Sequence, residues 1–218
     1  MKLLHIDSSI RNENSVTRRL SAELVAQWCG IYPNTQVERL DLAVDAPGHF
    51  NSDSLGVKYG LQAEPTERQR AENALSERLL TQFLETDVII MGVPLYNFTV
   101  PTQLKAWIDR LAQPGRSFKY VDGVSVGLAA GKTVIAAMGR GSIYSTTDAG
   151  RAKEHQETFL KVMFGFFGIT DIRFVRAEGI SMGETAMQAG IQNGYAEVAA
   201  LIAAEAKAPS RKAGALAS

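Results

Sequence analysis

Three short segments carry groups that together could bind one ligand. The first is a polar loop with four hydroxyl side chains, Ser8, Ser9, Ser15 and Thr17. Hydroxyl groups and free backbone amides at the start of a helix form an anion site, because the helix dipole is positive there. The loop matches neither a P-loop nor a Rossmann GxGxxG pattern, so we expect a terminal phosphate monoester as its ligand. A simple helix N-cap flanked by solvated serines is the alternative.

The second segment runs from Pro94 through Leu95 to Phe98 and places two aromatic rings, Tyr96 and Phe98, on either side of Asn97. Backbone amides, a side-chain amide and flat aromatic walls suit a planar heteroaromatic ring with several hydrogen-bonding edges. The alternative is a hydrophobic loop that packs on its own helix.

The third segment is Gly139-Arg140-Gly141-Ser142. Glycine lets the backbone approach a ligand closely, so amides here could hold the carbonyl end of the same ring. The alternative is an ordinary turn between a strand and a helix.

Each of these segments follows an apolar run that is too short for a helix and is typical of a buried strand. The sequence predicts five strands, at 2–7, 36–42, 88–93, 132–138 and 172–177. It also predicts five helices, from Val16 or Thr17 to Trp28 with Gly30 ending it, and at 67–84, 102–112, 154–167 and 184–206. A small hairpin is expected at 118–126, and residues 43–65 show no clear period.

Five strands alternating with five helices predict a doubly wound α/β fold with helices on both faces of a five-stranded parallel sheet. The flavodoxin-like strand order 2-1-3-4-5 is expected. In that order the first, third and fourth strands are neighbours, so the three loops meet at one carboxyl edge, where such sheets bind their ligands. A phosphate loop, a ring loop and a glycine loop side by side predict an FMN site. Residues 1–206 are expected to form a single FMN-binding domain and 207–218 a disordered tail.

Composition excludes several other classes of protein. Among 218 residues, Lys plus Arg and Asp plus Glu both number 23, so the net charge is zero. This argues against nucleic-acid binding and against electrostatic docking to a membrane, and no apolar run approaches membrane length. The single cysteine, Cys29, allows no internal disulfide, which favours the cytoplasm. The three histidines share no metal-ligand spacing, so no metal is expected; His5, in a strand, is expected to be a packed core residue.

The motifs as a set resemble those of the FMN-dependent NADH azoreductases, flavodoxin-like homodimers also described as NAD(P)H:quinone oxidoreductases. The matching segments are Ser8-Ser9-Ile10, Ser15-Val16-Thr17, Pro94–Phe98 with Thr102–Lys105, Gly139–Ser142, Phe166–Asp171 and Ala177–Ile180. The resemblance covers residues 1 to about 206. It differs at the third loop, where the family often has Ser-Arg-Gly-Gly, and at Tyr144, where the family often has His.

The resemblance implies a set of cofactor-binding residues. Those expected to bind the FMN phosphate are Ser9, Ser15, Val16 and Thr17. Those expected to line the flavin ring are Pro94, Leu95, Tyr96, Asn97, Phe98, Gly139, Arg140, Gly141 and Ser142. Asn97 is the side chain whose loss should most weaken flavin binding. Arg140 would either support the reduced flavin or form a surface salt bridge.

The resemblance also implies a ping-pong reaction. NADH or NADPH would deliver hydride to the flavin and leave, and a quinone or an azo dye would then take the electrons. Because the cofactor carries this chemistry, no catalytic side chain is expected. The residues expected to contact substrate are Phe118, Tyr120, Tyr144 and Tyr59. Tyr59 would reach the site of the partner in a homodimer whose sites lie near the interface.

Two other functions fit parts of the pattern. A flavodoxin-type electron carrier would also bind FMN, but it would pass single electrons to protein partners and usually has a strongly acidic docking surface. A hydrolase with Ser8 or Ser9 as nucleophile would need a G-x-S-x-G elbow, which the sequence lacks.

Overall fold

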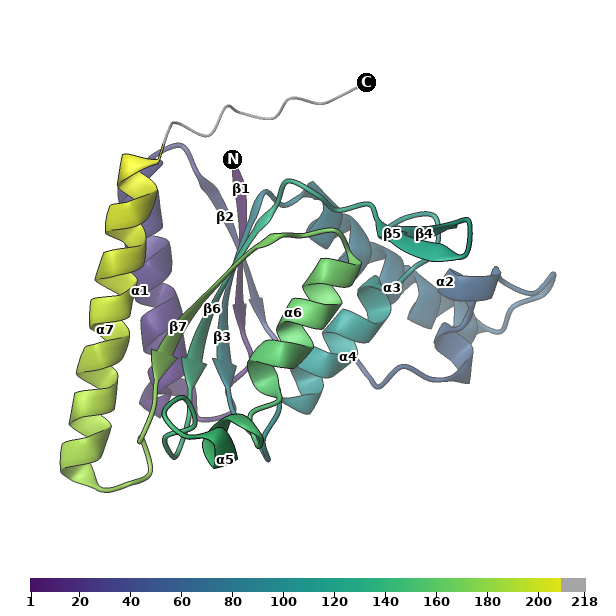
Figure 1. Cartoon of the computed structure of the whole chain (residues 1–218). Helices are drawn as coiled ribbons and strands as arrows, with labels where there is room; N and C mark the ends of the chain where they lie inside the picture. The colour runs from purple at the N-terminus through teal and green to yellow at the C-terminus, as the bar shows by residue number, and fades with distance from the viewer. Residues whose placement is uncertain (209–218) are drawn as a thin grey trace.

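A five-stranded parallel sheet between two layers of helices forms the centre of the molecule in a computed structural model, which describes residues 1–208 (Figure 1). Its strands are β1 (Lys2–Asp7), β2 (Gln36–Asp41), β3 (Val88–Pro94), β6 (Thr133–Gly139) and β7 (Asp171–Ala177). They lie in the order β2-β1-β3-β6-β7. The remaining strands, β4 (Phe118–Val121) and β5 (Val124–Gly127), form a separate antiparallel hairpin. With the hairpin left out of the count, the order is the predicted 2-1-3-4-5.

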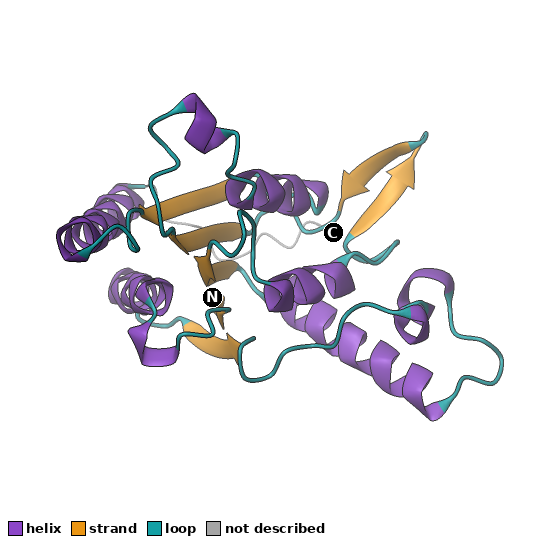
Figure 2. Cartoon of the chain, turned by 90° about the horizontal axis from the view of Figure 1, so that it is seen from below, coloured by secondary structure: helices purple, strands orange, loops and turns teal. Residues whose placement is uncertain are grey.

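Helices cover both faces of the sheet, as the end-on view shows (Figure 2). Helices α1 (Val16–Ile31) and α7 (Glu184–Lys207) pack on one face. The other face is covered by α3 (Glu67–Glu85), α4 (Thr102–Leu111) and α6 (Gln156–Phe166). Shorter helical turns lie in the connections: η1 (Asn12–Asn14), η2 (Ser52–Ser54), α2 (Gly56–Tyr59) and α5 (Asp148–Arg151).

Strand β3 lies at the middle of the sheet and is buried along its whole length. Side chains of a strand alternate between its faces, so Val88 and Ile90 join the core under α1 and α7, whereas Ile89, Met91 and Val93 join the core under α3, α4 and α6. Burial on both faces explains why the run is continuously apolar. The central strand is therefore a rigid support for the loop that follows it.

Several element ends differ from the sequence prediction. Helix α1 continues through Gly30 to Ile31, because its packing on the sheet outweighs the weak helix propensity of one glycine. Pro94 is the last residue of β3, where the missing N–H costs little. Helix α7 reaches Lys207, which was expected to begin the tail; the rest of that tail, 209–218, lies outside the described residues.

The predicted hairpin is confirmed, with its turn at Asp122 and Gly123. Both residues have positive φ angles, 51° and 78°, which is the conformation of a type I′ turn and explains the Asp-Gly pair. The hairpin projects from the layer of α3, α4 and α6, away from the carboxyl ends of β3 and β6 (Figure 1).

Candidate active site

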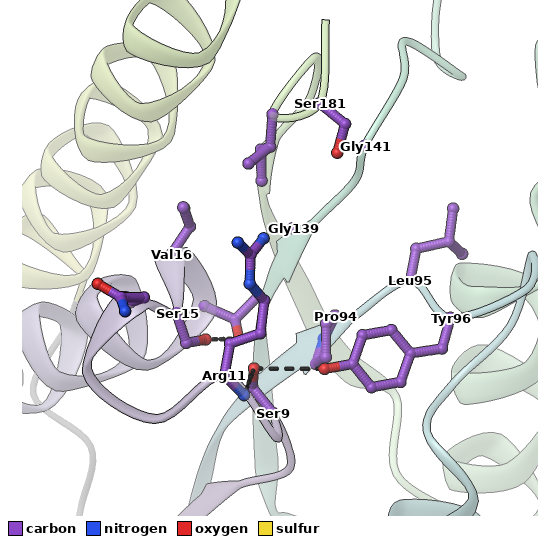
Figure 3. Close-up of a pocket in the computed structure, with 13 residues that line it drawn as sticks. Ser9, Arg11, Ser15, Val16, Pro94, Leu95, Tyr96, Gly139, Gly141 and Ser181 are labelled. Atoms are coloured by element: carbon purple, nitrogen blue, oxygen red, sulfur yellow. Dashed lines mark hydrogen bonds between the residues drawn. The ribbon is translucent and has the colours of Figure 1, made fainter. Parts of the chain in front are cut away.

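A cavity of about 260 Å³ lies at the carboxyl edge of the sheet, between the loops that follow β1, β3, β6 and β7. Figure 3 shows its walls. The lining residues are Ser9, Arg11, Asn14, Ser15, Val16, Thr17, Pro94, Leu95, Tyr96, Gly139, Gly141, Ile180 and Ser181. The structure thus brings together members of all three loops that the sequence singled out.

The loop after β1 leads into the N-terminus of α1. Ser15 is the N-cap of this helix, and its Oγ accepts a hydrogen bond of 3.3 Å from the backbone N–H of Arg18. The same Oγ lies 3.1 Å from Oγ1 of Thr17. Ser9, Ser15 and Thr17 are all buried at this wall. Hydroxyl groups and the first amides of a 16-residue helix therefore converge on one side of the cavity, which is the arrangement that binds anions.

The loop after β3 is held to the loop after β6. The backbone N–H of Leu95 donates a 2.8 Å hydrogen bond to the carbonyl oxygen of Gly139. Tyr96 and Thr99 exchange two backbone hydrogen bonds of 3.0 and 3.1 Å around a tight turn. At its tip, Asn97 and Phe98 have positive φ angles of 47° and 71°, a conformation that is costly for residues other than glycine. The turn presents Pro94, Leu95 and Tyr96 to the cavity.

Asn97 and Phe98 are exposed and are absent from the cavity lining. The Phe98 ring instead meets Tyr144 edge to face, with centroids 6.3 Å apart. The carbonyl oxygen of Phe98 accepts a 3.0 Å hydrogen bond from the N–H of His155. The role expected for the Asn97 amide in flavin binding therefore stays a prediction, and Tyr96 is the aromatic residue that the structure brings to the cavity.

The two glycines of the loop after β6 lie where a side chain has little room. A Cβ on Gly139 would lie 2.8 Å from Cγ2 of Thr17, and one on Gly141 would lie 3.0 Å from Oγ of Ser181. Backbone hydrogen bonds tie this loop to the one after β7, from Ile180 to Arg140 at 3.1 Å and from Ser181 to Gly141 at 2.9 Å. Ser142 is exposed and does not line the cavity. Close packing of bare backbone is therefore what these glycines provide.

The side chain of Arg140 points away from the cavity and is buried, with 1% of the residue exposed. Its guanidinium contacts three carboxylates, Glu157 at 2.8 Å, Glu178 at 2.9 Å and Glu154 at 3.3 Å. The side chain of Arg140 is therefore neither a cation beside the ring nor part of a surface salt bridge, the two alternatives that were expected; it belongs to a buried charge network. The cause is charge compensation, because a buried guanidinium requires carboxylate partners. Glu157 of α6, Glu154 just before α6 and Glu178 after β7 supply them.

Two of the carboxylates around Arg140, those of Glu157 and Glu178, have lowered pKa values. Burial opposes the charge of Glu157, but hydrogen bonds and charge from Arg176 and Arg140 outweigh it and lower its pKa to about 2. The pKa of Glu178 is also lowered, since Ser145 and Arg140 stabilise the carboxylate more than its burial penalises it. The network ties the loop after β6 to its two neighbouring elements.

The residues expected to contact substrate do not line the cavity of their own chain. Phe118 is 7% exposed and packs on Phe166, with ring centroids 4.5 Å apart. Tyr120 and Tyr59 are 66% and 81% exposed, but they lie on the hairpin and on α2, away from the carboxyl edge of the sheet (Figure 1). These expectations stay predictions: Tyr59 was expected to reach the site of a partner copy, and the hairpin that carries Phe118 and Tyr120 lies away from the carboxyl edge of its own sheet (Figure 1). Tyr144, which follows β6, packs on Phe98 outside the cavity lining.

Sequence reasoning missed four lining residues. Arg11 and Asn14 lie inside the serine-rich loop, where only the hydroxyl groups were considered. Ile180 and Ser181 follow β7, whose neighbour in the sheet is β6. The predicted strand order already placed that loop at the same edge, so the signal was present. Among the described residues that line the cavity, Arg11 alone has a charged side chain.

Beneath the cavity floor, His5 is buried and its Nε2 lies 3.0 Å from Oγ of Ser21 and 3.7 Å from Asp7. Burial lowers the pKa of His5 despite the nearby carboxylate, so the expected packed core histidine is confirmed. Over residues 1–208, His, Cys, Asp and Glu side chains do not gather into a group able to hold a metal ion. In the same range, every helix is too short or too polar to span a bilayer.

Comparisons with known proteins agree with this geometry. Residues 1–202 match the family described as having a flavodoxin-like fold. The chain is 60% identical over 198 residues to the FMN-dependent NADH:quinone oxidoreductase of Albidiferax ferrireducens, covering 91% of this chain and 98% of that protein. It is 54% identical over 209 residues to the protein of the same name from Polaromonas naphthalenivorans, covering 95% and 96%.

Solved structures give the same result. An azoreductase from Bacillus anthracis matches with a TM-score of 0.84 at 30% identity, covering 93% of this chain and 98% of that one. An FMN-dependent NADH-azoreductase from the same species, solved in complex with FMN, matches with a TM-score of 0.86 at 26% identity, covering 94% and 99%. The chain therefore belongs to the FMN-dependent NADH:quinone oxidoreductase family, within the flavodoxin-like fold.

Proposed function

We propose that this chain is an FMN-dependent oxidoreductase that uses NADH to reduce quinones and aromatic azo compounds. The observation that carries the proposal is the meeting of three loops at one cavity: a hydroxyl-rich helix N-terminus, an aromatic turn and a bare glycine backbone. The names of the relatives support FMN, NADH and quinones, and the titles of the structural neighbours support azo compounds.

The wall formed by the loop after β1 fits the phosphate of FMN. A phosphate monoester has three acceptor oxygens and a charge of about −1.5 to −2 near neutral pH. Ser9, Ser15 and Thr17 offer buried hydroxyl groups, and the N-terminus of α1 adds amides and the positive end of its dipole. The exposed side chain of Arg11 also lines the cavity, and its positive charge is complementary to a phosphate.

The opposite walls fit the flavin ring. Pro94, Leu95 and Tyr96 form a flat and largely apolar side. Gly139 and Gly141 leave backbone bare: a Cβ on Gly139 would lie 2.8 Å from Thr17, and one on Gly141 would lie 3.0 Å from Ser181, so a neighbour would have to shift. A planar ring fits between the aromatic turn and this backbone, because glycine has no side chain to take up the space that the ring would occupy.

Bound FMN would supply the redox chemistry, by accepting a hydride from NADH and donating two electrons to the acceptor. The protein would bind the cofactor and the substrates and orient them. The Oη of Tyr96 accepts a 3.3 Å hydrogen bond from the backbone N–H of Ile10. This bond joins the turn after β3 to the loop after β1. Within residues 1–208, neither a carboxylate nor a histidine lines the cavity, so we propose no protein acid or base for hydride transfer. We also propose the cytoplasm as the compartment, since NADH is the electron source.

We propose a homodimer in which the hairpin and α2 of one copy complete the cavity of the other. Two observations support this. The cavity, at about 260 Å³, is smaller than the roughly 300–1,000 Å³ of typical ligand sites, so added walls would be needed to enclose a cofactor and a substrate. The hairpin exposes four large apolar side chains far from its own cavity: Tyr120, Val121, Val124 and Val126. Such a surface usually marks a protein contact.

The flavodoxin-type carrier is the competing function. A carrier usually docks on proteins through a strongly acidic surface, whereas this chain has 23 basic and 23 acidic residues and no net charge.

Steady-state kinetics of the FMN-loaded protein test the enzyme directly, with NADH or NADPH as donor and a quinone series or an azo dye as acceptor. We expect turnover far above that of free FMN. NADH should be preferred, because one cation in the lining, Arg11, is not the cluster that a 2′-phosphate needs. Quinone turnover no faster than that of free FMN would reject the proposal.

A further inference from the structure

Arg18 is the third residue of α1 and is absent from the cavity lining. Its side chain is only 14% exposed, and it lies directly behind the loop that we propose binds the FMN phosphate. Neither the hydroxyl pattern of that loop nor its resemblance to a known family points to this arginine.

Arg18 contacts both ends of the phosphate loop. At the far end, its backbone N–H donates to Oγ of Ser15 at 3.3 Å. At the near end, its guanidinium donates twice to the carbonyl oxygen of Ser9, from Nε at 3.1 Å and from Nη2 at 2.8 Å. One residue therefore sets the separation of the two serines whose hydroxyl groups face the cavity.

The guanidinium is itself fixed from behind. Nη1 and Nη2 donate to the two oxygens of the Asp41 carboxylate at 2.6 and 2.7 Å, a bidentate pair. This pair lowers the pKa of Asp41 and raises that of Arg18, in each case mainly through the hydrogen bonds between them. The backbone N–H of Ala43 holds Asp41 from the other side at 3.0 Å. The arginine thus cannot turn toward the cavity without breaking a charged pair.

Arg18 also offsets negative charge close to the site. Asp7 is fully buried at the end of β1, and its Oδ2 lies 3.5 Å from Nη1 of Arg18 and 3.2 Å from Nη2 of Arg39. If Arg18 were removed, the carboxylates of Asp7 and Asp41 would lie near a bound phosphate dianion, and Arg39 would be their one remaining counter-charge among these contacts. Like charges repel, and the repulsion is less screened for the buried Asp7 than for Asp41, whose side chain is 28% exposed.

We propose that Arg18 is a positioning residue for the phosphate of FMN: it holds the Ser9 peptide and the Ser15 cap in the geometry that converges on the phosphate, and it neutralises the two carboxylates behind them. This inference rests on the proposed function, since it assumes that FMN is the ligand. Arg18 acts through the loop and does not itself touch the cofactor.

The inference separates phosphate recognition from ring recognition. A merely structural arginine would change stability, or would weaken FMN and riboflavin equally, because both share the flavin ring. A phosphate-positioning arginine should affect FMN alone. Lysine is the informative conservative variant, because one ammonium keeps the charge but cannot hold the Ser9 carbonyl and both oxygens of Asp41 in one rigid fork.

The test measures dissociation constants of FMN and riboflavin by flavin fluorescence on the full-length apoprotein, for wild type, R18K, R18M and R19M. Arg19 is exposed on the same helix and provides the matched control. Circular dichroism and thermal melting identify the folded variants, and R18K is the reference if R18M does not fold. We expect FMN to bind roughly tenfold or more weakly to R18M and several-fold more weakly to R18K. Riboflavin should change less than about twofold, and R19M should match wild type.

Equal losses for FMN and riboflavin, or unchanged FMN binding in a folded Arg18 variant, would overturn the role of Arg18. Absence of FMN binding to the wild-type protein would instead overturn the proposed function. As a second readout, the visible spectrum of FMN bound at saturation should be the same in R18K and wild type, because the ring walls are untouched. A shifted spectrum would show that the ring site was altered and would count against a phosphate-specific role.

Discussion

The phenol oxygen of Tyr96 lies 3.5 Å from Oγ of Ser9. This contact joins the turn after β3, which forms the proposed ring wall, to the loop after β1, which forms the proposed phosphate wall. A second hydrogen bond, from the N–H of Ile10 to the same phenol oxygen at 3.3 Å, strengthens the link. One hydroxyl group therefore sets the spacing between the two binding walls, and removing it should affect ligand binding more than folding.

Replacement of Tyr96 by Phe removes that hydroxyl and keeps the ring wall. We expect the FMN dissociation constant to rise by about two- to tenfold, the equivalent of one ordinary hydrogen bond, while the melting temperature changes little. Flavin fluorescence titration measures the first and calorimetry the second. Y195F removes the hydroxyl of an exposed tyrosine on α7 and should bind FMN as wild type does; a Y96F protein with wild-type affinity would refute the role of the link.

Replacement of Gly139 by Ala should damage the site through sterics. The new methyl group would lie 2.8 Å from Cγ2 of Thr17 and 3.2 Å from Cδ1 of Ile180, so the loops after β1 and β7 must move apart. We expect a loss of about 1–3 kcal/mol in the free energy of unfolding and FMN binding at least tenfold weaker. In the control G165A, the methyl group would have no neighbour within 4 Å, so α6 should be unharmed or slightly stabilised. Equal effects of the two substitutions would contradict this account.

Glu157 predicts a definite pH dependence of stability. Its pKa falls from 4.5 when unfolded to about 2 in the folded chain. A lowered pKa means that the carboxylate stabilises the fold above about pH 4.5, and that this stabilisation is lost as the pH falls toward 2. E157Q should therefore lose about 2–3 kcal/mol of unfolding free energy at pH 7, and the deficit should shrink as the pH falls from about 4.5.

Urea unfolding across this pH range measures the deficit. Glu64 is exposed, so E64Q should follow the wild-type profile throughout. A deficit for E157Q that stayed constant down to low pH would show that its contribution is not electrostatic.

The hairpin predicts the behaviour of the proposed dimer. Val124 is 66% exposed at the tip of the hairpin, so V124K should fold normally while placing a charge in the interface. We expect sedimentation velocity to show a shift toward monomer, together with reduced quinone turnover. V37K, on the edge strand β2 at a position 44% exposed, should leave the assembly unchanged. A V124K protein that sediments and turns over as wild type does would reject the hairpin as the contact.

Sequence patterns were sufficient for the fold. The run Val88–Val93 carries no polar side chain because β3 is buried on both faces. The Asp122-Gly123 pair marks the turn of the β4–β5 hairpin, because both residues adopt positive φ angles there. For the site, strand order alone was enough to place Ser9, Tyr96 and Gly139 around one cavity. These features depend on local pattern and on topology, which a sequence records directly.

Tertiary charge pairing was not predictable in the same way. The side chain of Arg140 was expected either to support the reduced flavin or to form a surface salt bridge. It is instead buried against three glutamates, which come from α6, the segment just before α6 and the loop after β7. Arg18 was overlooked because its partner Asp41 is distant in sequence. The direction of a long charged side chain depends on which carboxylates the fold brings near it, and periodicity does not carry that information.

Anaerobic rapid mixing of the FMN-loaded protein with NADH, followed by a quinone in a second mixing step, tests the central claim most directly. The proposed function predicts that NADH bleaches the visible flavin band within the turnover time. It also predicts that the quinone restores the band after NAD⁺ has been removed, as a ping-pong oxidoreductase requires. A flavin that NADH leaves oxidised on this timescale, as in an electron carrier, would contradict the assignment.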